Sequence, residues 1–343
     1  MKKSSMYQEI LDQPGIARAA VEKRWAEADK INNILREADQ IIFLGTGASL
    51  NACYGAKAAV IKYLNKIPAI VEMAEAQDIV PAITDKTVCF LVSQSGASKE
   101  TVDGIDYICG TKAITIAVTN EKESYLAGKS DITLVLEAGK EISSATKTCT
   151  ASILLMLMAI CCHDGNAVGQ LKEIPGLMEK AINALSGKVP EVAEGLLAEK
   201  AFYIGALGAL YPAARQGALL IKEKDFILTE GLSISELRHG TVEAVYENMP
   251  VFIAAVNDDV KKAAEHAKYF ADHVKANAFL ITSEKTEREQ ENITYIYIEN
   301  SKNDCFAGIC TTIFFQLLSE KIADLNGYDV DGFRYLSKVI EHY

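Results

Sequence analysis

Short apolar runs alternate with amphipathic stretches along the first half of the chain. The apolar runs lie at residues 40–44, 69–73, 87–91, 113–118 and 131–136. They are rich in β-branched residues, and the stretches between them place apolar residues at the i, i+3 and i+4 positions of a helix. Strands that alternate with helices form a parallel sheet covered by helices, so this half is predicted to be an α/β domain.

The second half repeats this plan. Apolar runs at 201–205, 251–256, 278–281 and 293–298 are predicted strands, and 305–325 is a long apolar helix. Two halves with one plan indicate duplication. Pro14 is expected to divide the N-terminal segment into a short and a long helix. The expected organisation is an N-terminal helical segment (1–39), a first domain (40–165), a helical linker (166–200), a second domain (201–325) and a C-terminal tail (326–343).

Composition narrows the class of protein. The 343 residues suffice for two domains, and 49% apolar with 24% charged residues is ordinary for a globular protein. A net charge of -11 without a basic tract argues against a nucleic-acid partner. There is no apolar signal segment at the N-terminus, and the apolar run 151–162 is too short to span a bilayer. We therefore expect a cytoplasmic protein without a membrane partner.

Cysteine and histidine patterns bear on cofactors. The eight cysteines lie mostly in apolar runs and form no Cys-x-x-Cys pair, which indicates buried reduced thiols. The five histidines show no spacing typical of metal ligands. We therefore expect no metal site and no other cofactor.

A serine-rich loop follows the predicted strand 87–91. Ser93, Ser95 and Ser98 supply hydroxyl groups, Gly96 lets the backbone approach a ligand, and a helical pattern begins just after them. Hydroxyls beside a helix N-terminus favour an anion, and we expect a phosphate here. The alternative is a serine-rich helix cap without a ligand.

A glycine-rich turn, Gly-Thr-Gly-Ala-Ser at 45–49, follows the first predicted strand. A dinucleotide site is one interpretation, because strand, glycines and helix are all present, but a third glycine is missing from its expected offset. Adjacent parallel strands end side by side, so we expect Ser49 to face the same ligand as Ser93.

Glu223 lies on a predicted helix beside an apolar face. A carboxylate at the edge of a pocket has a raised pKa and can serve as a general base for carbon-bound protons. The alternative is a solvated charge beside Lys222 and Lys224, and composition alone favours that alternative.

Three motifs resemble one known family. Ser93-Gln94-Ser95-Gly96, followed by Ser98, resembles the sugar-phosphate loop of the SIS (sugar isomerase) fold, in the form found in the isomerase half of glucosamine-6-phosphate synthase. The run from Gln216 to Gly240 is similar to the catalytic stretch of that half, and the run from Gly327 to Lys338 is similar to its C-terminal tail.

The resemblance implies a fold, a site and an assembly. The fold would be two tandem SIS domains, each a flavodoxin-like parallel sheet of five strands flanked by helices. Glu223 would move a proton between C1 and C2 of the sugar, His239 would assist ring opening from the neighbouring subunit of a homodimer, and Lys338 would form a Schiff base with the sugar ketone. The phosphosugar would be held by Ser49, Ser93, Gln94, Ser95 and Ser98 at its phosphate and by Ser143 at the sugar.

Two departures from the family pattern change the expected substrate. Gln216 and Leu220 replace a glutamate and a lysine of the family's catalytic helix, and the synthase's glutaminase domain has no counterpart, so we expect no use of glutamine. The expected function is isomerisation, deamination or deglycation of an (amino)sugar 6-phosphate. A non-catalytic phosphosugar sensor is the alternative.

Overall fold

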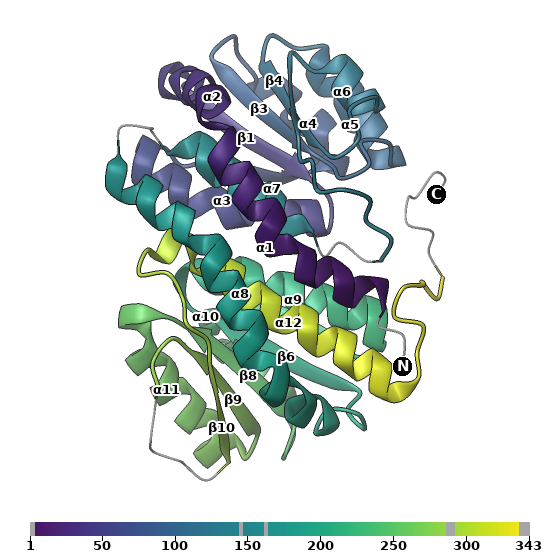
Figure 1. Cartoon of the computed structure of the whole chain (residues 1–343), viewed down its shortest axis with the longest axis vertical. Coiled ribbons are helices and arrows are strands. Elements are labelled where there is room, and N and C mark those ends of the chain that lie inside the picture. The colour runs from purple at the N-terminus through teal and green to yellow at the C-terminus, as the bar shows by residue number, and fades with distance from the viewer. Residues whose placement is uncertain (1–3, 144–146, 161–163, 286–291, 336–343) are drawn as a thin grey trace. The chain divides into compact units, whose positions relative to one another are not determined.

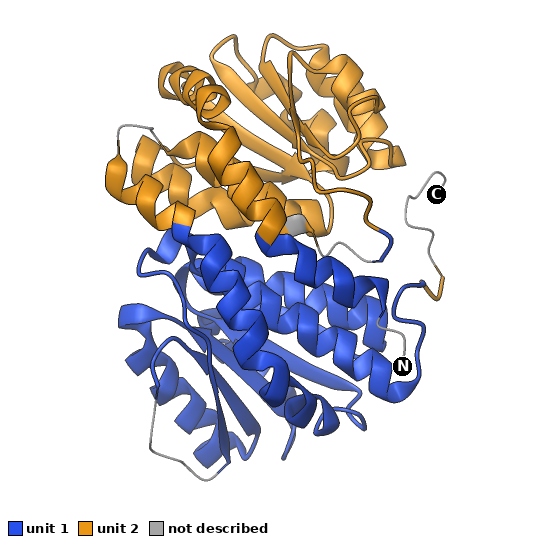
Figure 2. Cartoon of the chain, viewed as in Figure 1, with its two compact units in different colours: residues 1–14, 142–146, 173–332 blue, residues 15–141, 147–172, 333–343 orange. Residues whose placement is uncertain are grey.

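Two five-stranded parallel sheets form the framework of the protein (Figure 1). The structure is a computed structural model that describes residues 4–143, 147–160, 164–285 and 292–335. Each sheet belongs to a separate compact unit (Figure 2). Unit 1 comprises residues 1–14, 142–146 and 173–332, and unit 2 comprises residues 15–141, 147–172 and 333–343.

The sheet of unit 2 has the strand order β2-β1-β3-β4-β5, with every neighbouring pair parallel. The strands are β1 Gln40–Gly45, β2 Ala69–Glu72, β3 Thr87–Val92, β4 Ile114–Thr119 and β5 Ile132–Val135. The helices are α2 Trp25–Glu37, α3 Ala48–Leu64, α4 Ala76–Ile79, α5 Lys99–Cys109, α6 Tyr125–Lys129 and α7 Thr148–Ala159. The apolar runs of the first half therefore form the predicted parallel sheet.

The sheet of unit 1 has the order β10-β9-β8-β6-β7, again all parallel. Counted from its own first strand, this is the order of unit 2, which confirms the predicted pair of α/β domains with one topology. The strands are β6 Ala201–Ala206, β7 Leu228–Ser233, β8 Pro250–Ala255, β9 Asn277–Thr282 and β10 Ile293–Tyr297. The longer helices of the second half are α8 Gly165–Glu194, α9 Tyr211–Asp225, α11 Val260–Tyr269 and α12 Asp304–Asn326, and α10 Ile234–Arg238 is short.

Strand β7 is absent from the runs that the sequence indicated. Its residues, Leu-Thr-Glu-Gly-Leu-Ser, include a glycine and a glutamate, both unfavourable in strands. β7 lies at the edge of its sheet and pairs only with β6, so much of it stays exposed. An edge strand needs no continuous apolar run, which explains why hydrophobicity alone did not reveal it.

The predicted break at Pro14 is wrong. Helix α1, Ser5–Lys23, continues through Pro14, and the chain leaves helical geometry only at Arg24, before α2. Proline removes one backbone hydrogen bond from a helix interior. Buried apolar side chains on both sides of it, such as Ile10 and Ala17, keep the helix continuous.

Helix α12 is long and apolar enough to cross a membrane, with 23 residues and a mean hydropathy of 1.3 over its most apolar window. Within that window, 83% of the residues are buried inside the structure. In unit 1 it lies beside α9 (Figure 1), where a Cβ on Gly217 would lie 2.5 Å from Cγ of Phe315. Such close packing is that of a core helix.

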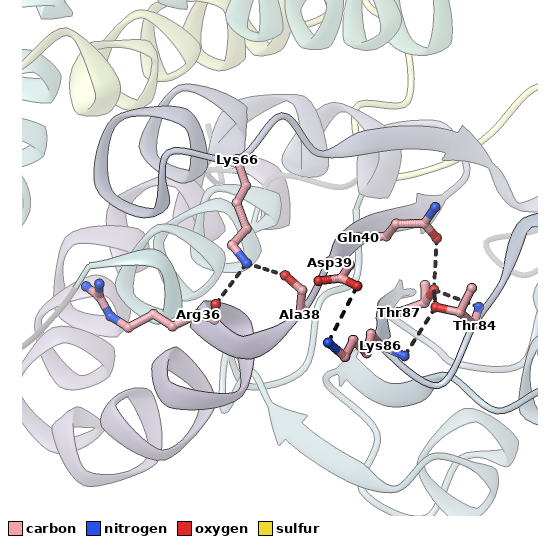
Figure 3. Close-up of polar contacts among 8 residues, drawn as sticks. All are labelled: Arg36, Ala38, Asp39, Gln40, Lys66, Thr84, Lys86 and Thr87. Carbon is pink, nitrogen blue, oxygen red and sulfur yellow. Dashed lines mark hydrogen bonds and ion pairs between the residues drawn. The ribbon is translucent and has the colours of Figure 1, made fainter.

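Polar contacts fasten the amino ends of β1 and β3 (Figure 3). The Thr87 hydroxyl donates to the Gln40 side-chain oxygen at 2.9 Å. Lys66 Nζ donates to the Arg36 carbonyl oxygen at 2.9 Å and to that of Ala38, at the end of α2. Backbone pairing then runs in register from Gln40 and Thr87 to Leu44 and Leu91. The two strands therefore end level with each other at their carboxyl ends.

Candidate functional site

The carboxyl ends of β1 and β3 meet where the strand order of unit 2 reverses. Ligands of open α/β sheets bind in the crevice at such a switch point. The turn after β1 leads to Ser49, and the loop after β3 contains the candidate phosphate loop, residues 93–98. Topology alone thus brings Ser49 and the candidate phosphate loop to one edge of the sheet.

Hydrogen bonds within the candidate phosphate loop fix its shape. Ser93 Oγ accepts from the Gly96 N–H at 3.1 Å, and Ser95 Oγ accepts from the Ala97 N–H at 3.3 Å. A hydroxyl that accepts one backbone N–H keeps its own proton for a phosphate oxygen. The Gln94 carbonyl oxygen accepts from the Asn120 N–H at 3.0 Å, which ties the loop to the end of β4.

Ser98 stands at the N-cap position of α5, yet its side chain makes no capping bond to the helix backbone. Its hydroxyl lies 2.6 Å from that of Thr101. The first N–H groups of a helix that no side chain caps can bind an anion. This geometry favours the ligand interpretation of the loop over the simple helix cap.

Gly96 is the residue that permits this loop conformation. Its φ of +62° lies in the left-handed region, and a Cβ would lie 2.4 Å from the Ser124 hydroxyl oxygen. The Gly96 carbonyl also accepts from the Leu126 N–H at 3.2 Å. A side chain here would push the loop away from the start of α6.

Gly96→Ala is expected to weaken phosphosugar binding about tenfold, because both the backbone strain and the clash displace the serine hydroxyls. Isothermal titration with a sugar 6-phosphate measures the loss. Gly128→Ala is the matched control, since a Cβ there meets nothing within 4 Å. Equal affinity of the Gly96 and Gly128 variants would contradict a role for the loop in binding.

The turn after β1 brings a second hydroxyl to this edge. Gly47 precedes α3 with a φ of 54°, and Ser49 in the first turn of α3 is half-buried. The Ser49 N–H donates to the Thr46 carbonyl oxygen at 3.0 Å, while the Thr46 hydroxyl donates to Glu72 at 2.6 Å. The Glu72 carboxylate therefore has its hydrogen-bond partner within the turn after β1.

The equivalent switch point of unit 1 has different chemistry. There β6 and β8 end side by side, and β8 is followed by Asn257, Asp258 and Asp259. Asp259 Oδ2 would lie 3.1 Å from a Cβ on Gly208, in the turn after β6. Carboxylates repel a phosphate, so the serine-rich loop of unit 2 is the stronger candidate for an anion site.

Unit 1 carries Glu223, in the last turn of α9, where its side chain is half-buried. The face of α9 that carries Gln216 and Leu220 is buried, with exposed fractions of 3% and 0%. The two positions at which the sequence departs from the family pattern thus lie inside the protein. Lys224, which follows Glu223, is 1% exposed, and its Nζ donates to the Gly332 carbonyl oxygen at 2.8 Å.

Asp225 is a buried acid that the sequence analysis did not single out. It is 3% exposed, and the side chain that acts on its carboxyl group as a hydrogen-bond partner is that of Ser319. Burial raises the pKa of Asp225 to about 8, against the opposing charge of Lys224. The spacing of Gly217, Leu220 and Lys224 on the buried face was the signal that charged residues end α9 inside the protein.

Asp225→Asn is expected to stabilise the protein at alkaline pH. The unfolded carboxyl ionises near pH 4 and the folded one near pH 8, so wild-type stability falls between these values by up to about 1.4 kcal/mol per pH unit. The asparagine variant lacks this slope. Urea unfolding at pH 5 and pH 8 measures it, with the exposed Asp258→Asn as control. Parallel pH profiles of wild type and Asp225→Asn would refute the raised pKa.

His239 follows α10 and is exposed. Its N–H closes the helix by donating to the Ser235 carbonyl oxygen at 2.9 Å, and Gly240 after it has a φ of 114°. The neighbouring Arg238 guanidinium lies 3.6 Å from the Tyr269 ring centroid, and one of its nitrogens lies 3.2 Å from His266 Nδ1. These contacts with α11 hold the segment while the His239 ring stays accessible.

Glu223 and His239 lie toward opposite ends of the sheet in unit 1. α9 ends just before β7 begins at Leu228, whose N–H donates to the Lys200 carbonyl oxygen beside the start of β6. Leu237, two residues before His239, would lie 2.9 Å from a Cβ on Gly205, near the end of β6. The six residues of β7 span about 17 Å, so this length separates the two positions.

Ser143 is fully buried, and its hydroxyl donates to the Val330 carbonyl oxygen at 3.1 Å. In this structure Ser143 therefore binds the segment that leads to the C-terminus. Lys338 lies outside the described residues. The candidate phosphate loop belongs to unit 2, whereas Glu223, His239 and Ser143 belong to unit 1.

The sequence of the chain matches known proteins. It is 28% identical over 319 residues to the Bos taurus glutamine–fructose-6-phosphate aminotransferase [isomerizing] 2, a match that covers 89% of this chain and 46% of that protein. The chain thus spans about half the length of this relative. The name of this relative combines an aminotransferase with an isomerising activity.

Solved structures match the fold. The C-terminal domain of glucosamine-fructose-6-phosphate aminotransferase from Francisella tularensis superposes with a TM-score of 0.86 at 22% identity, over 96% of this chain and 98% of that one. Glucosamine-6-phosphate deaminase from Thermotoga maritima gives a TM-score of 0.78 at 20% identity, over 99% and 100%. At these identities the likeness concerns the fold.

The sequence model of the SIS domain family matches the chain twice, at residues 34–162 and 195–321. Each match covers one of the two sheets, and together they cover most of the chain. The resemblance expected from the serine loop, the stretch from Gln216 to Gly240 and the tail is thereby confirmed at the level of the family. The chain belongs to the SIS domain family, with two SIS domains in tandem.

Proposed function

We propose that the protein is an enzyme that transfers a proton between C1 and C2 of a sugar 6-phosphate or of its nitrogen-substituted derivative. The observation that carries this proposal is the candidate phosphate loop at the switch point of the first SIS domain, where Ser93 and Ser95 are fixed by backbone contacts. Preformed hydroxyls and an uncapped helix N-terminus suit the phosphate of such a substrate. The relatives that act on hexose phosphates support this substrate class.

The proposed steps follow from the residues available. Ser49, Ser93, Gln94, Ser95 and Ser98 bind the phosphate, which leaves the other end of the sugar for the chemistry. The protonated His239 imidazole gives a proton to the ring oxygen while water takes the proton of the anomeric hydroxyl, so the bond between the anomeric carbon and the ring oxygen breaks and a free carbonyl forms at C1 or C2. The Glu223 carboxylate removes the proton from the neighbouring carbon and returns it to the other carbon, with the enediol or enamine between the two steps.

The fate of the sugar nitrogen decides the reaction class. When the substrate carries no amine, return of the proton completes an aldose–ketose isomerisation. When the substrate carries an amine, the same transfer gives an imine that water hydrolyses, and ammonia or an amino acid leaves. The Lys338 amine would serve the open-chain carbonyl as a Schiff base.

The separation of Glu223 from His239 supports a homodimeric site. Within one chain the length of β7 keeps these side chains apart, and one sugar cannot span about 17 Å between its C2 and its ring oxygen. A second copy, related by a two-fold axis, would place its His239 beside the first copy's Glu223.

Proton NMR in deuterated water tests the proposal, with fructose 6-phosphate, glucosamine 6-phosphate and a fructosamine 6-phosphate as substrates. Deuterium is expected to enter at C1 or C2 of at least one of them. Release of ammonia from the aminosugar would identify a deaminase, and release of the amino acid from the fructosamine would identify a deglycase. Tight binding of these sugars without deuterium exchange would contradict the proposed enzyme and indicate a non-catalytic phosphosugar sensor.

A further inference from the structure

The residue that follows the proposed general base in the sequence is a buried lysine. Lys224 is 1% exposed, and the carbonyl oxygen of Gly332 accepts from its Nζ at 2.8 Å. Removing a lysine charge from water is costly unless polar partners compensate. Burial lowers the pKa of Lys224, and the negative charges of Glu223, Asp331, Asp329 and Glu9 act against that shift. The carboxylates that act on Lys224 therefore come from α9 itself and from two other parts of unit 1, α1 and the segment that follows α12.

Two of these carboxylates hold the backbone of other segments. Asp331 accepts from the Ser5 N–H at 2.8 Å and from the Met6 N–H at 2.9 Å, so it caps the start of α1. Glu9 is 4% exposed and accepts from the Ser143 N–H at 3.3 Å.

Three consecutive residues, Val330, Asp331 and Gly332, are thus each held by a different partner. Ser143 Oγ binds the Val330 carbonyl, α1 binds the Asp331 side chain, and Lys224 binds the Gly332 carbonyl. We call these contacts the tail anchor. Of its partners only Lys224 lies on the helix that carries Glu223.

We propose that Lys224 is a positioning residue that fastens the C-terminal tail to the helix of the general base and keeps a positive charge beside Glu223. Loss of Lys224 frees the start of the tail and removes a charge that favours the ionised form of Glu223. This inference rests on the proposed function for its kinetic consequences, while the anchoring itself is independent of it.

Lys224→Met tests the proposal, because methionine has a similar length but no charge and no donor. Hydrogen exchange of the amides in residues 328–335 is expected to accelerate about tenfold, with the rest of unit 1 unchanged. Turnover is expected to fall about tenfold, and the acid limb of the kcat/KM profile to move to higher pH by roughly half a unit to one unit. Lys222→Met, at an exposed position two residues earlier, is the matched control and should behave as wild type.

Lys224→Gln separates the hydrogen bond from the charge. The amide can still donate to the Gly332 oxygen, so tail protection should be largely kept while the acid limb shifts as in the methionine variant. If Lys224→Met fails to fold, this variant carries the test, and an acid limb at its wild-type pH would overturn the proposal.

The experiments distinguish failure of the tail anchor from failure of the proposed function. An active wild type together with a folded Lys224→Met variant of unchanged tail exchange and pH profile would overturn the tail anchor. A wild type that exchanges no proton with any phosphosugar would overturn the proposed function, yet accelerated tail exchange in the variant would still establish the anchor.

Discussion

Glu223→Gln is expected to reduce proton exchange with the substrate by about 10²–10⁴-fold, while the affinity for the phosphosugar stays within about twofold of wild type. The amide keeps the shape of the side chain but cannot accept a proton, and a positioned general base contributes about this factor. Single-turnover exchange in deuterated water and isothermal titration provide the two measurements.

The matched control for this variant is Glu265→Gln, an exposed glutamate on α11. It should exchange at the wild-type rate. Full activity of Glu223→Gln would rule out general-base catalysis by this residue, and a parallel loss of binding would instead indicate a role in holding the sugar.

Mixing two inactive variants is expected to restore activity if His239 acts across subunits. Glu223→Gln and His239→Ala homodimers each lack one group in every site. In a randomly reassorted mixture about half of the dimers are mixed, and each mixed dimer has one site with both groups intact. Activity should therefore recover to about a quarter of the wild-type value.

The measurement requires subunits that exchange, so the variants are unfolded together in urea and refolded. Each variant treated alone is the control and should remain inactive. A mixture that remains inactive, although the subunits have reassorted, would place both groups of a site in the same chain. Sedimentation of an active monomer would contradict the dimer directly.

Most of the fold could be predicted because its central strands are apolar on both faces. Parallel strands covered by helices form continuous runs such as Val88–Leu91, and these are easy to recognise. β7 could not be found this way because it is an edge strand with only one neighbour. The continuation of α1 through Pro14 was also missed, since packing on both sides outweighs a local helix breaker.

The sequence indicates the chemical groups of the candidate site but not the buried contacts that surround them. Hydroxyls and a glycine after a strand indicate a phosphate loop, and the family pattern adds Glu223 and His239. Periodicity places Lys224 on the buried face of α9 but does not show what accommodates its charge, because that contact comes from a residue more than a hundred positions away. Tertiary partners of this kind leave no local trace in a sequence.

The cap of α1 has a consequence for synthesis of the protein. Asp331 binds the Ser5 N–H across 326 residues, so this contact at the start of the first helix forms only when nearly the whole chain has left the ribosome. At 5–20 residues per second this takes about 15 s to a minute. During that interval the start of α1 lacks its contact with Asp331, whereas residues 15–141 already hold a complete sheet. Assembly should therefore begin with the serine-bearing domain, and the contact between Asp331 and the start of α1 should form last.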